Sequence, residues 1–475
     1  MVKTSTNPDA IPALIANLFT LIQAHRPAFR QERPFWRAWG LVLAEVFSFG
    51  RHTLTQALLS LGLSEGDWSA WYRLFSRPRF AEERLAHSLF QETLAEVPLE
   101  QPYVVGGDST QIPRSSRKLP GTGWLKAPRT PVFKVGIHRA QRFLTGAWLT
   151  PLEEGFSRAV PLRFLPAFPA KAVPAGVPSQ KEWQAGLAYV AWVRQELDRA
   201  GREEQLVLAL FDGSFDRLGF WAGLPEGVVG VVRTAKNRAL YELPAPSVGP
   251  GRPARYGPRA PTPQQWLHQG VRFQTREVLV RGHPRQMRFT LQGPFLREDL
   301  PDKPLFLLVV KGSTQKLGKR RSKYHGPSYY LISAVERQGR WELPLPIELI
   351  LAWLWQRWEL EVAHREMKSS LGVGEKQCWG KRSAVSSVQW GAWVYALLVL
   401  AGYRTWGLLG GPRFSTAWWS GGKRWSFNTL WRAYRQALWG RSEFSPGWQG
   451  TGDNWLKKEA WLLALGNAVT GAARI

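Results

Sequence analysis

The feature that most constrains the fold is a run of six apolar residues, Leu206 to Phe211, that ends directly in Asp212. A run this short and this uniformly apolar is typical of a strand buried on both faces of a sheet. Residues 103–107 form a weaker run of the same kind, which also ends in an aspartate, Asp108. Lys181 to Ala200, between the two runs, has apolar residues at helical spacing. Strands that alternate with a helix predict an α/β layer fold.

Further strands are predicted on both sides of this helix. Val132–Ala140 and Phe143–Leu152 have the composition of two strands, and we predict a hairpin that turns near Gln141. A proline-rich connection is predicted over residues 161–178. After the helix, Val228–Arg233 is predicted to be another buried strand.

Residues 240–338 interrupt the alternation of strands and helices. Proline and glycine are dense at first, and four short strand-like segments follow: Val271–Arg281, Gln286–Leu291, Leu305–Lys311 and Tyr329–Arg337. We therefore predict a mostly-β insertion. Its loop over residues 311–325 is strongly basic and holds Lys316, Lys319, Arg320, Arg321 and Lys323. Such charge runs are commonly solvated loops, but in so basic a chain we predict that this loop contacts phosphates.

The first hundred residues are predicted to be helical. Residues 52–64 and 67–75 have the pattern of two short helices, separated by a stop at Gly62. This pattern permits a helix-turn-helix, with Arg73, Arg77 and Arg79 near its second helix and Arg73 as a candidate DNA contact. Two packed helices without any role in DNA binding share the same pattern, so the sequence leaves both interpretations open.

The charge of the chain points to a polyanionic partner. Lys+Arg 63 against Asp+Glu 36 gives a formal net charge of +27, and such a surplus favours nucleic acid through release of counterions. A membrane is not expected, because the longest apolar run, Trp390 to Tyr403, is shorter than the roughly 20 residues that a spanning helix needs. We predict a buried core helix there. The N-terminal residues carry no signal peptide, and a cytoplasmic location is expected.

Two classes of site are excluded by residue counts and spacing. The single cysteine, Cys378, allows no intramolecular disulfide. The eight histidines have no paired spacing, so no zinc site is expected. Any metal is therefore expected to be hard and bound by oxygen.

Asp108 and Asp212 are the first candidates for such oxygen ligands. Both follow strands, and strand ends are where α/β sheets bind ligands. If the two strands are neighbours, the carboxylates converge, and a divalent cation such as Mg²⁺ would relieve their repulsion. An aspartate in this position is also often a turn former or a helix cap, so neither residue alone decides the matter.

A third carboxylate, Glu361, lies on a helix that is predicted from Pro346 to Leu371. At 100° per residue, the spacing places Arg357, Glu361 and Lys368 on one face of that helix. An ordinary solvated face with ion pairs would look similar. The competing acids Glu359 and Glu366 lie roughly on the opposite face.

This helix resembles a known family. The spacing Arg357-x3-Glu361-x6-Lys368 closely resembles the Y-x2-R-x3-E-x6-K signature of DDE-type bacterial insertion-sequence transposases. Gly107-Asp-Ser-Thr110 and Phe211-Asp-Gly-Ser214 resemble the two aspartate motifs of that family. The resemblance covers roughly residues 35–405. Leu354 stands at the position of the signature tyrosine, and leucine cannot donate a hydrogen bond to a phosphate.

The resemblance implies an RNase H-like catalytic core. Asp108, Asp212 and Glu361 would be the catalytic residues and the ligands of Mg²⁺, with two ions expected and Mn²⁺ as a substitute. The side chains expected to contact DNA are Arg73, Lys319, Arg320, Arg321, Lys323, Arg357, Arg365 and Lys368.

The expected domains follow from these elements. They are a helical DNA-binding domain (1–98), the first part of the core (99–239), the insertion (240–338), the second part of the core (339–410) and a helical C-terminal segment (411–475). That last segment is tryptophan-rich, since twelve of the 26 tryptophans lie from Trp379 onward.

The resemblance implies cut-and-paste DNA transposition with metal-dependent cleavage and strand transfer, a DNA hairpin being one route of release. Expected partners are terminal inverted repeats, target DNA and a second copy of the chain. Two alternatives stay open: a decayed or domesticated DNA-binding protein, and a nuclease of the same fold without strand transfer.

Overall fold

The structure is a computed structural model that describes residues 13–127, 136–170, 173, 179–245, 253–316, 322–412 and 422–439. Lys319, Arg320 and Arg321, which were predicted to contact phosphates, lie outside the described residues. The same is true of residues 440–475, the larger part of the predicted C-terminal segment.

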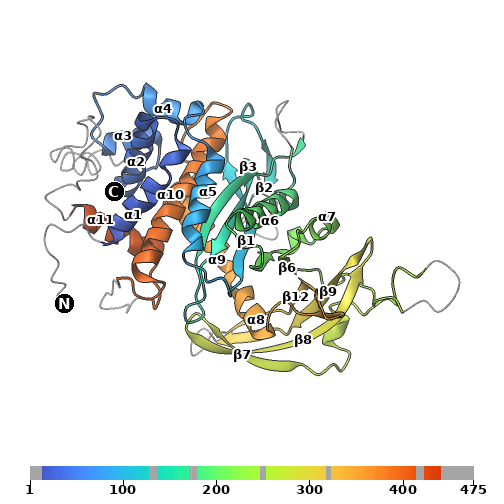
Figure 1. Cartoon of the computed structure of the whole chain (residues 1–475). Helices are drawn as coiled ribbons and strands as arrows, with labels where there is room; N and C mark the ends of the chain where they lie inside the picture. Colours follow the sequence, from blue (N-terminus) through green and yellow to red (C-terminus); the bar gives the residue numbers. More distant parts are fainter. Residues whose placement is uncertain are drawn as a thin grey trace.

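A ten-stranded sheet forms the centre of the molecule (Figure 1). Its first strands are β1 Tyr103–Pro113, β2 Thr122–Lys126, β3 Ile137–Leu149, β4 Ala159–Pro166, β5 Val207–Phe211 and β6 Val228–Arg233. The strands β1, β5 and β6 are parallel, whereas β3 is antiparallel to β1, and both β2 and β4 are antiparallel to β3. The helix α6 (Glu182–Arg199) lies between β4 and β5 in the sequence, so the predicted α/β class is confirmed.

The strands of the predicted insertion continue this same sheet. The order runs on from β6 through β12, β9 and β8 to β7 (Figure 1). Their bounds are β7 Gln274–Val280, β8 His283–Arg297, β9 Leu300–Val310 and β12 Ser328–Ser333. Two small ribbons pair β10 (Ser313–Lys316) with β11 (Ser322–His325) and β13 (Val335–Arg337) with β14 (Arg340–Glu342). The insertion is therefore joined to the core by backbone hydrogen bonds between β12 and β6.

The predicted hairpin turn near Gln141 is wrong. The strand β3 runs without a turn through this residue, and its first part pairs with β2 while its second part pairs with β4. Gln141 is buried, where its Nε2 donates to the carbonyl of Pro120 at 2.7 Å and its Oε1 accepts from Arg114 Nε at 2.9 Å. A polar side chain that finds both partners inside the protein needs no solvent-exposed turn.

The predicted proline-rich connection over residues 161–178 is also partly wrong, because its first residues form β4. Pro161 and Pro166 both take part in the register with β3. Proline lacks the N–H group that a central strand must donate, but an edge strand tolerates it. Among the described strands, β4 pairs with β3 alone, which explains how two prolines fit there.

Helices cover the sheet and build a separate N-terminal layer. The helices of this layer are α1 Ala13–Ala24, α2 Glu32–Phe47, α3 Leu54–Ser60, α4 Ser69–Ser76 and α5 Glu82–Leu94. The long helix α10 (Ser383–Trp406) packs on α1 and on β4, so it lies between α1 and the sheet, whereas α5 packs on β4 directly (Figure 1). The remaining helices include α7 Leu218–Ala222 and α11 Phe427–Trp439, with short 3₁₀ turns at Arg26–Ala28, Gly213–Phe215 and Gln265–Leu267.

The helix α10 contains the longest apolar run of the sequence, for which a buried core helix was predicted. Among the described helices it alone is long and apolar enough to cross a membrane, but 89% of its apolar window is buried inside the protein. The prediction of a core helix over these residues is confirmed.

The single helix predicted from Pro346 to Leu371 is divided in two. The helix α8 (Ile347–Gln356) is followed by α9 (Trp358–Ser369), and the two meet at Arg357. Buried polar contacts on each side of the junction hold the two segments separately. Gln356 donates to the carbonyl of Gly155 at 3.1 Å, and Glu359 pairs with Arg424 at 2.7 Å. Such long-range contacts leave no trace in a local helical pattern.

Candidate active site

Asp108 and Asp212 lie side by side on one face of the sheet. In the parallel pair of β1 and β5, Gly106 is opposite Leu210 and Gly107 is opposite Phe211, and Asp108 and Asp212 each come directly after this last pair. Paired residues of neighbouring strands point to the same face of a sheet. The sequence predicted that the two carboxylates converge if their strands are neighbours, and β1 and β5 are neighbours in the sheet.

Two glycines before Asp108 allow close packing around it. A Cβ atom at Gly106 would lie 2.9 Å from Leu360 Cδ1 of α9, and one at Gly107 would lie 2.1 Å from the ring of Phe211. Because side chains alternate along a strand, Gly106 and Asp108 share the face that α9 covers. The pair of glycines is thus the local signal that a helix and an aromatic ring approach the strand at this point.

The helix α9 brings Glu361 to the same face. Glu361 Oε1 accepts a hydrogen bond from Arg357 Nη2 at 2.9 Å, which confirms that these two residues share one side of the helix. Glu361 is the more accessible of the pair, with 34% of its side chain exposed against 21% for Arg357. The third predicted carboxylate is therefore partly open to solvent and held by a neighbouring cation.

The charges of the two other acids act on Asp108. Burial raises the pKa of Asp108, Arg357 lowers it, and the negative charges of Asp212 and Glu361 raise it; together these effects bring the pKa to about 7. The side chain of Asp108 is only 16% exposed. Such a raised pKa is the effect of burial and of repulsion between carboxylates, a repulsion that a bound cation would relieve.

His364 completes this face of α9 and was not predicted from the sequence. Its Nε2 is joined by a hydrogen bond of 2.8 Å to Oγ1 of Thr145, and its Nδ1 lies 3.9 Å from Asp108 Oδ2. Thr145 is the residue of β3 directly opposite Asp108. Burial and the positive charges of Lys368 and Arg357 lower the pKa of His364 to about 3, so the ring is neutral at physiological pH. Lys368 therefore lies near His364, on the side of α9 that was predicted.

Asp212 is held by Ser214, two residues further along the chain. The Ser214 hydroxyl lies 2.7 Å from Asp212 Oδ1 and 3.0 Å from Glu182 Oε1, and the backbone N–H of Ser214 donates to the same Asp212 oxygen at 2.9 Å. A hydroxyl has one hydrogen and can donate to only one of the two carboxylates at a time. Glu182, at the start of α6, is thus a fourth acid beside the site that sequence patterns did not indicate.

Asp216 is close in sequence but serves another purpose. It is 4% exposed and accepts hydrogen bonds from Arg297 at 2.7 Å, Arg238 at 2.5 Å and Thr234 at 2.6 Å. Arg297 belongs to β8, so this buried carboxylate ties the insertion to the core. All three of these hydrogen-bond partners are side chains of the protein itself.

The two competing acids of α9 are engaged on its other side. Glu366 accepts hydrogen bonds from Arg158 at 2.7 Å and from the Tyr395 hydroxyl at 2.6 Å, all in the protein interior. Glu359 is 3% exposed and pairs with Arg424. Both carboxylates have their hydrogen-bond and ion-pair partners inside the protein, and they therefore hold α9 in place.

The remaining predicted DNA contacts lie apart from the carboxylates or follow them along α9. Arg365 is exposed one turn after Glu361. Lys323 is exposed on β11, and Arg73 lines a hollow beside α2 in the N-terminal layer. The structure therefore brings Arg357, Glu361 and Lys368 together with the aspartates, and it places Arg73 and Lys323 elsewhere.

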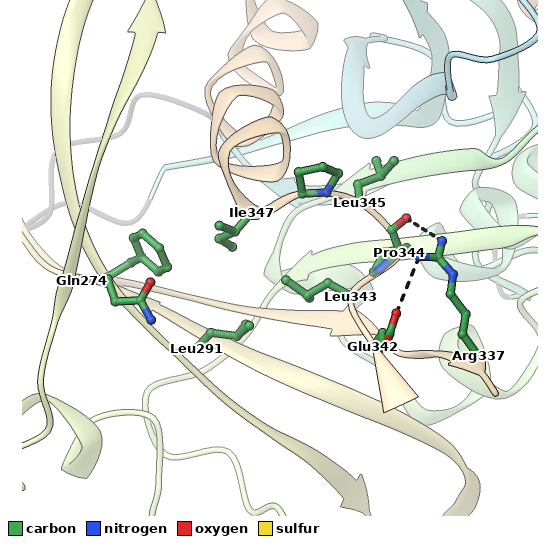
Figure 2. A pocket seen from close by; sticks show the side chains of 10 residues that line it. Gln274, Leu291, Arg337, Glu342, Leu343, Pro344, Leu345 and Ile347 are labelled. Carbon is green, nitrogen blue, oxygen red and sulfur yellow. Dashed lines mark hydrogen bonds and ion pairs between the residues drawn. The ribbon is translucent and has the colours of Figure 1, made fainter. Parts of the chain in front are cut away.

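A hollow of about 500 Å³ lies between the insertion strands and the start of α8 (Figure 2). Its lining is mostly apolar, with Leu291, Leu343 and Ile347 facing Gln274, and Arg337 bonded to the Pro344 carbonyl at one end. None of the three carboxylates lines it, so it is separate from the candidate active site.

The donor set suits a hard cation in chemical type, since three carboxylates share one face and the charges of Asp212 and Glu361 raise the pKa of Asp108. As the described side chains are placed, however, no group of three or more histidines, cysteines, aspartates or glutamates could hold a metal ion. Arg357 donates a hydrogen bond to one carboxylate oxygen of Glu361, and Ser214 donates one to a carboxylate oxygen of Asp212. Coordination of one cation by all three acids therefore requires side chains to move from the positions described.

The family comparison agrees with this geometry. The family of DDE superfamily endonucleases matches residues 25–287, more than half of the chain. The chain belongs to the DDE superfamily of endonucleases. The match includes Asp108 and Asp212, and the mixed sheet with its insertion agrees with the RNase H-like core of a DDE domain. A comparison with curated proteins finds no match.

The third candidate acid, Glu361, lies beyond the segment that the family matches. Glu361 follows residue 287 by a wide margin, so the family match does not include it. Its candidacy depends on the placement of α9 against β1 and on its effect on Asp108.

Proposed function

We propose that this DDE endonuclease is a DNA transposase that cleaves DNA at transposon ends and joins the freed 3′ end to target DNA. The observation that supports this most strongly is the convergence of Asp108, Asp212 and Glu361 on the α9 face of the sheet. The proposed pathway is cut-and-paste transposition, with a DNA hairpin as one route of release.

We propose that these three carboxylates hold divalent cations, two Mg²⁺ ions in the working enzyme, with Mn²⁺ as a substitute. Such ions would activate the attacking water and stabilise the leaving oxygen of the phosphodiester. Glu361 would exchange its hydrogen bond with Arg357 for a bound cation, and the guanidinium of Arg357 would then be available to a DNA phosphate. In this scheme Arg357 balances the negative charge of the site only until metal and DNA arrive.

Lys368 and Arg365 are proposed to contact phosphates beside the scissile bond, because both lie on α9 close after Glu361. Lys323 and the adjoining basic loop (Lys319, Arg320, Arg321) would contact DNA further out. Leu354 cannot make the phosphate contact that a tyrosine would make. Pairing of two transposon ends implies a homodimer on DNA, acting in the cytoplasm on the nucleoid.

The proposal is tested with a supercoiled plasmid and with oligonucleotides that carry the inverted repeats of the flanking DNA, each incubated with Mg²⁺. Cleavage at the repeats followed by joining to a second DNA supports a transposase. Nicking without joining would identify a nuclease of the same fold, and binding without cleavage would identify a DNA-binding protein. Asp212→Asn should abolish cleavage, whereas Glu204→Gln, the same charge change at an exposed residue far from the site, should not.

A further inference from the structure

Six arginines line two adjoining hollows on the N-terminal layer, and we call this surface the arginine groove. One hollow, of about 220 Å³, lies between the start of α2 and α4, and the next, of about 300 Å³, shares Gln31, Pro34 and Arg79 with it. The arginines are Arg30, Arg33, Arg37, Arg73, Arg77 and Arg79. The sequence placed Arg73, Arg77 and Arg79 near the second predicted helix, and the structure adds Arg30, Arg33 and Arg37 to the same surface.

Three of the groove arginines have no ion-paired acid in the part of the protein that the structure describes. Among the described residues, no carboxylate forms an ion pair with Arg30, Arg33 or Arg77. Elsewhere, Arg158, Arg238 and Arg404 each pair with one or two carboxylates. Like charges gathered with few counter-charges repel one another, and a bound polyanion relieves that repulsion.

The nearby acids leave this positive field in place. Glu32, in the first turn of α2, is taken up by Arg26, which does not line the groove. Asp67 is held by Ser69, whose hydroxyl and N–H bonds lower the pKa of Asp67, and the charges of Arg73 and Arg37 lower it further. Two groove arginines thus surround a single exposed acid.

The backbone of α2 adds to the field. Gln31, which lines both hollows, is the N-cap residue of this 16-residue helix, and its side chain makes no capping hydrogen bond. The first N–H groups of a helix carry partial positive charge and favour an anion at that end. The arginine side chains and the helix end therefore act in the same direction.

The chemistry of the groove fits phosphates better than bases. Guanidinium groups bind phosphate oxygens in pairs, through two parallel hydrogen bonds. The rest of the lining, with Pro34, Leu74 and Ala70, offers few side-chain groups that could distinguish base edges. Because six arginine side chains are spread over two hollows, they match a ligand with several phosphate groups better than a single small anion.

We propose that the arginine groove binds the sugar-phosphate backbone of double-stranded DNA independently of its sequence. This inference rests on the proposed function in that it assumes a DNA substrate. The groove lies on the far side of α10 from β1, so it is separate from the carboxylates (Figure 1). DNA held there would be anchored at a distance from the strand that is cut.

The test measures binding of two labelled duplexes of unrelated sequence over a range of salt concentrations. The test variant is Arg33→Gln with Arg77→Gln, both exposed positions of the groove. The matched control is Arg199→Gln with Arg276→Gln, which removes the same charge at exposed arginines outside the groove. Melting temperatures of all variants show whether each one is folded.

Each lost phosphate contact reduces the slope of log affinity against log salt by about one. We therefore expect the magnitude of this slope to fall by about two in the groove variant. Its affinity for both duplexes should fall by the same factor. The control variant should keep the wild-type slope. A wild-type slope in the folded groove variant would overturn the inference, as would a loss confined to one duplex. If the wild type bound neither duplex, the proposed function itself would fail instead.

Discussion

The two sides of α9 contain the same kinds of residue in opposite situations. On one side, Glu366 and Glu359 are buried and saturated by Arg158, Tyr395 and Arg424. On the other side, Glu361 is partly exposed, has one cation beside it and raises the pKa of a neighbouring acid. The comparison teaches that the two fully paired acids fix α9 in place. The helix can then present a third acid, Glu361, that has few partners of its own.

The largest effect should come from Glu361→Gln. Loss of one ligand charge should reduce metal-dependent DNA cleavage by on the order of 10³-fold or more, because stabilisation of the reacting phosphate depends on the bound cation. The melting temperature should not fall, since Glu361 is partly exposed. Gel assays of plasmid cleavage, with melting curves beside them, check both parts. Cleavage that persists at the wild-type rate would remove Glu361 from the site.

Glu366→Gln should have the reverse profile. It leaves Arg158 buried with its charge uncompensated, and breaking a buried pair destabilises a protein by about 3–5 kcal/mol. Chemical denaturation should show this loss in the free energy of unfolding. Unchanged stability would mean that this side of α9 does not anchor the helix.

Asp108→Asn should stabilise the metal-free protein at high pH. The pKa of Asp108 is raised from 3.8 to about 7 on folding, so the folded state keeps a proton that the unfolded chain has lost. Wild-type stability should therefore fall as the pH rises from about 4 to about 7, and the asparagine variant should lack this fall. The difference should reach roughly 4 kcal/mol above pH 7, because each pKa unit corresponds to about 1.4 kcal/mol. Urea unfolding in EDTA at pH 5 and pH 8 measures it, and equal differences at both pH values would contradict the account.

The smallest effect is expected for Ser214→Ala. Ser214 orients Asp212 through its hydroxyl, and loss of such a supporting hydrogen bond commonly reduces metal affinity or activity by about 10–100-fold. The Mg²⁺ concentration needed for half-maximal cleavage should rise. Ser116→Ala, outside the site, provides the control, and an unchanged Mg²⁺ requirement would show that the backbone alone holds Asp212.

The sequence predicted the parts of the site whose spacing is local. Asp108 and Asp212 were found because each follows an apolar strand, and Glu361 because its distance from Arg357 matches a helical repeat. His364 was missed, although it lies on the same helix face, because its meaning comes from Thr145 on a strand far away in the sequence. Glu182 escaped for the same reason.

The errors in the fold have related causes. The residues Gln141 and Arg142 looked like a turn, but Gln141 finds its hydrogen-bond partners in the interior. The prolines of β4 looked like a connection because position at a sheet edge is a property of the whole sheet. The break at Arg357 depends on Gly155 and Arg424, which are distant in the sequence from α8 and α9. In each case a tertiary contact outweighed a local pattern.

The central claim is that Asp108, Asp212 and Glu361 jointly form a divalent-cation site. Electron paramagnetic resonance of Mn²⁺, titrated into the wild type, Glu361→Gln and Glu204→Gln at pH 8, tests it most directly. The account predicts that the wild type and Glu204→Gln bind Mn²⁺ alike and that Glu361→Gln binds it at least about tenfold more weakly. Equal binding by the wild type and Glu361→Gln would contradict the account.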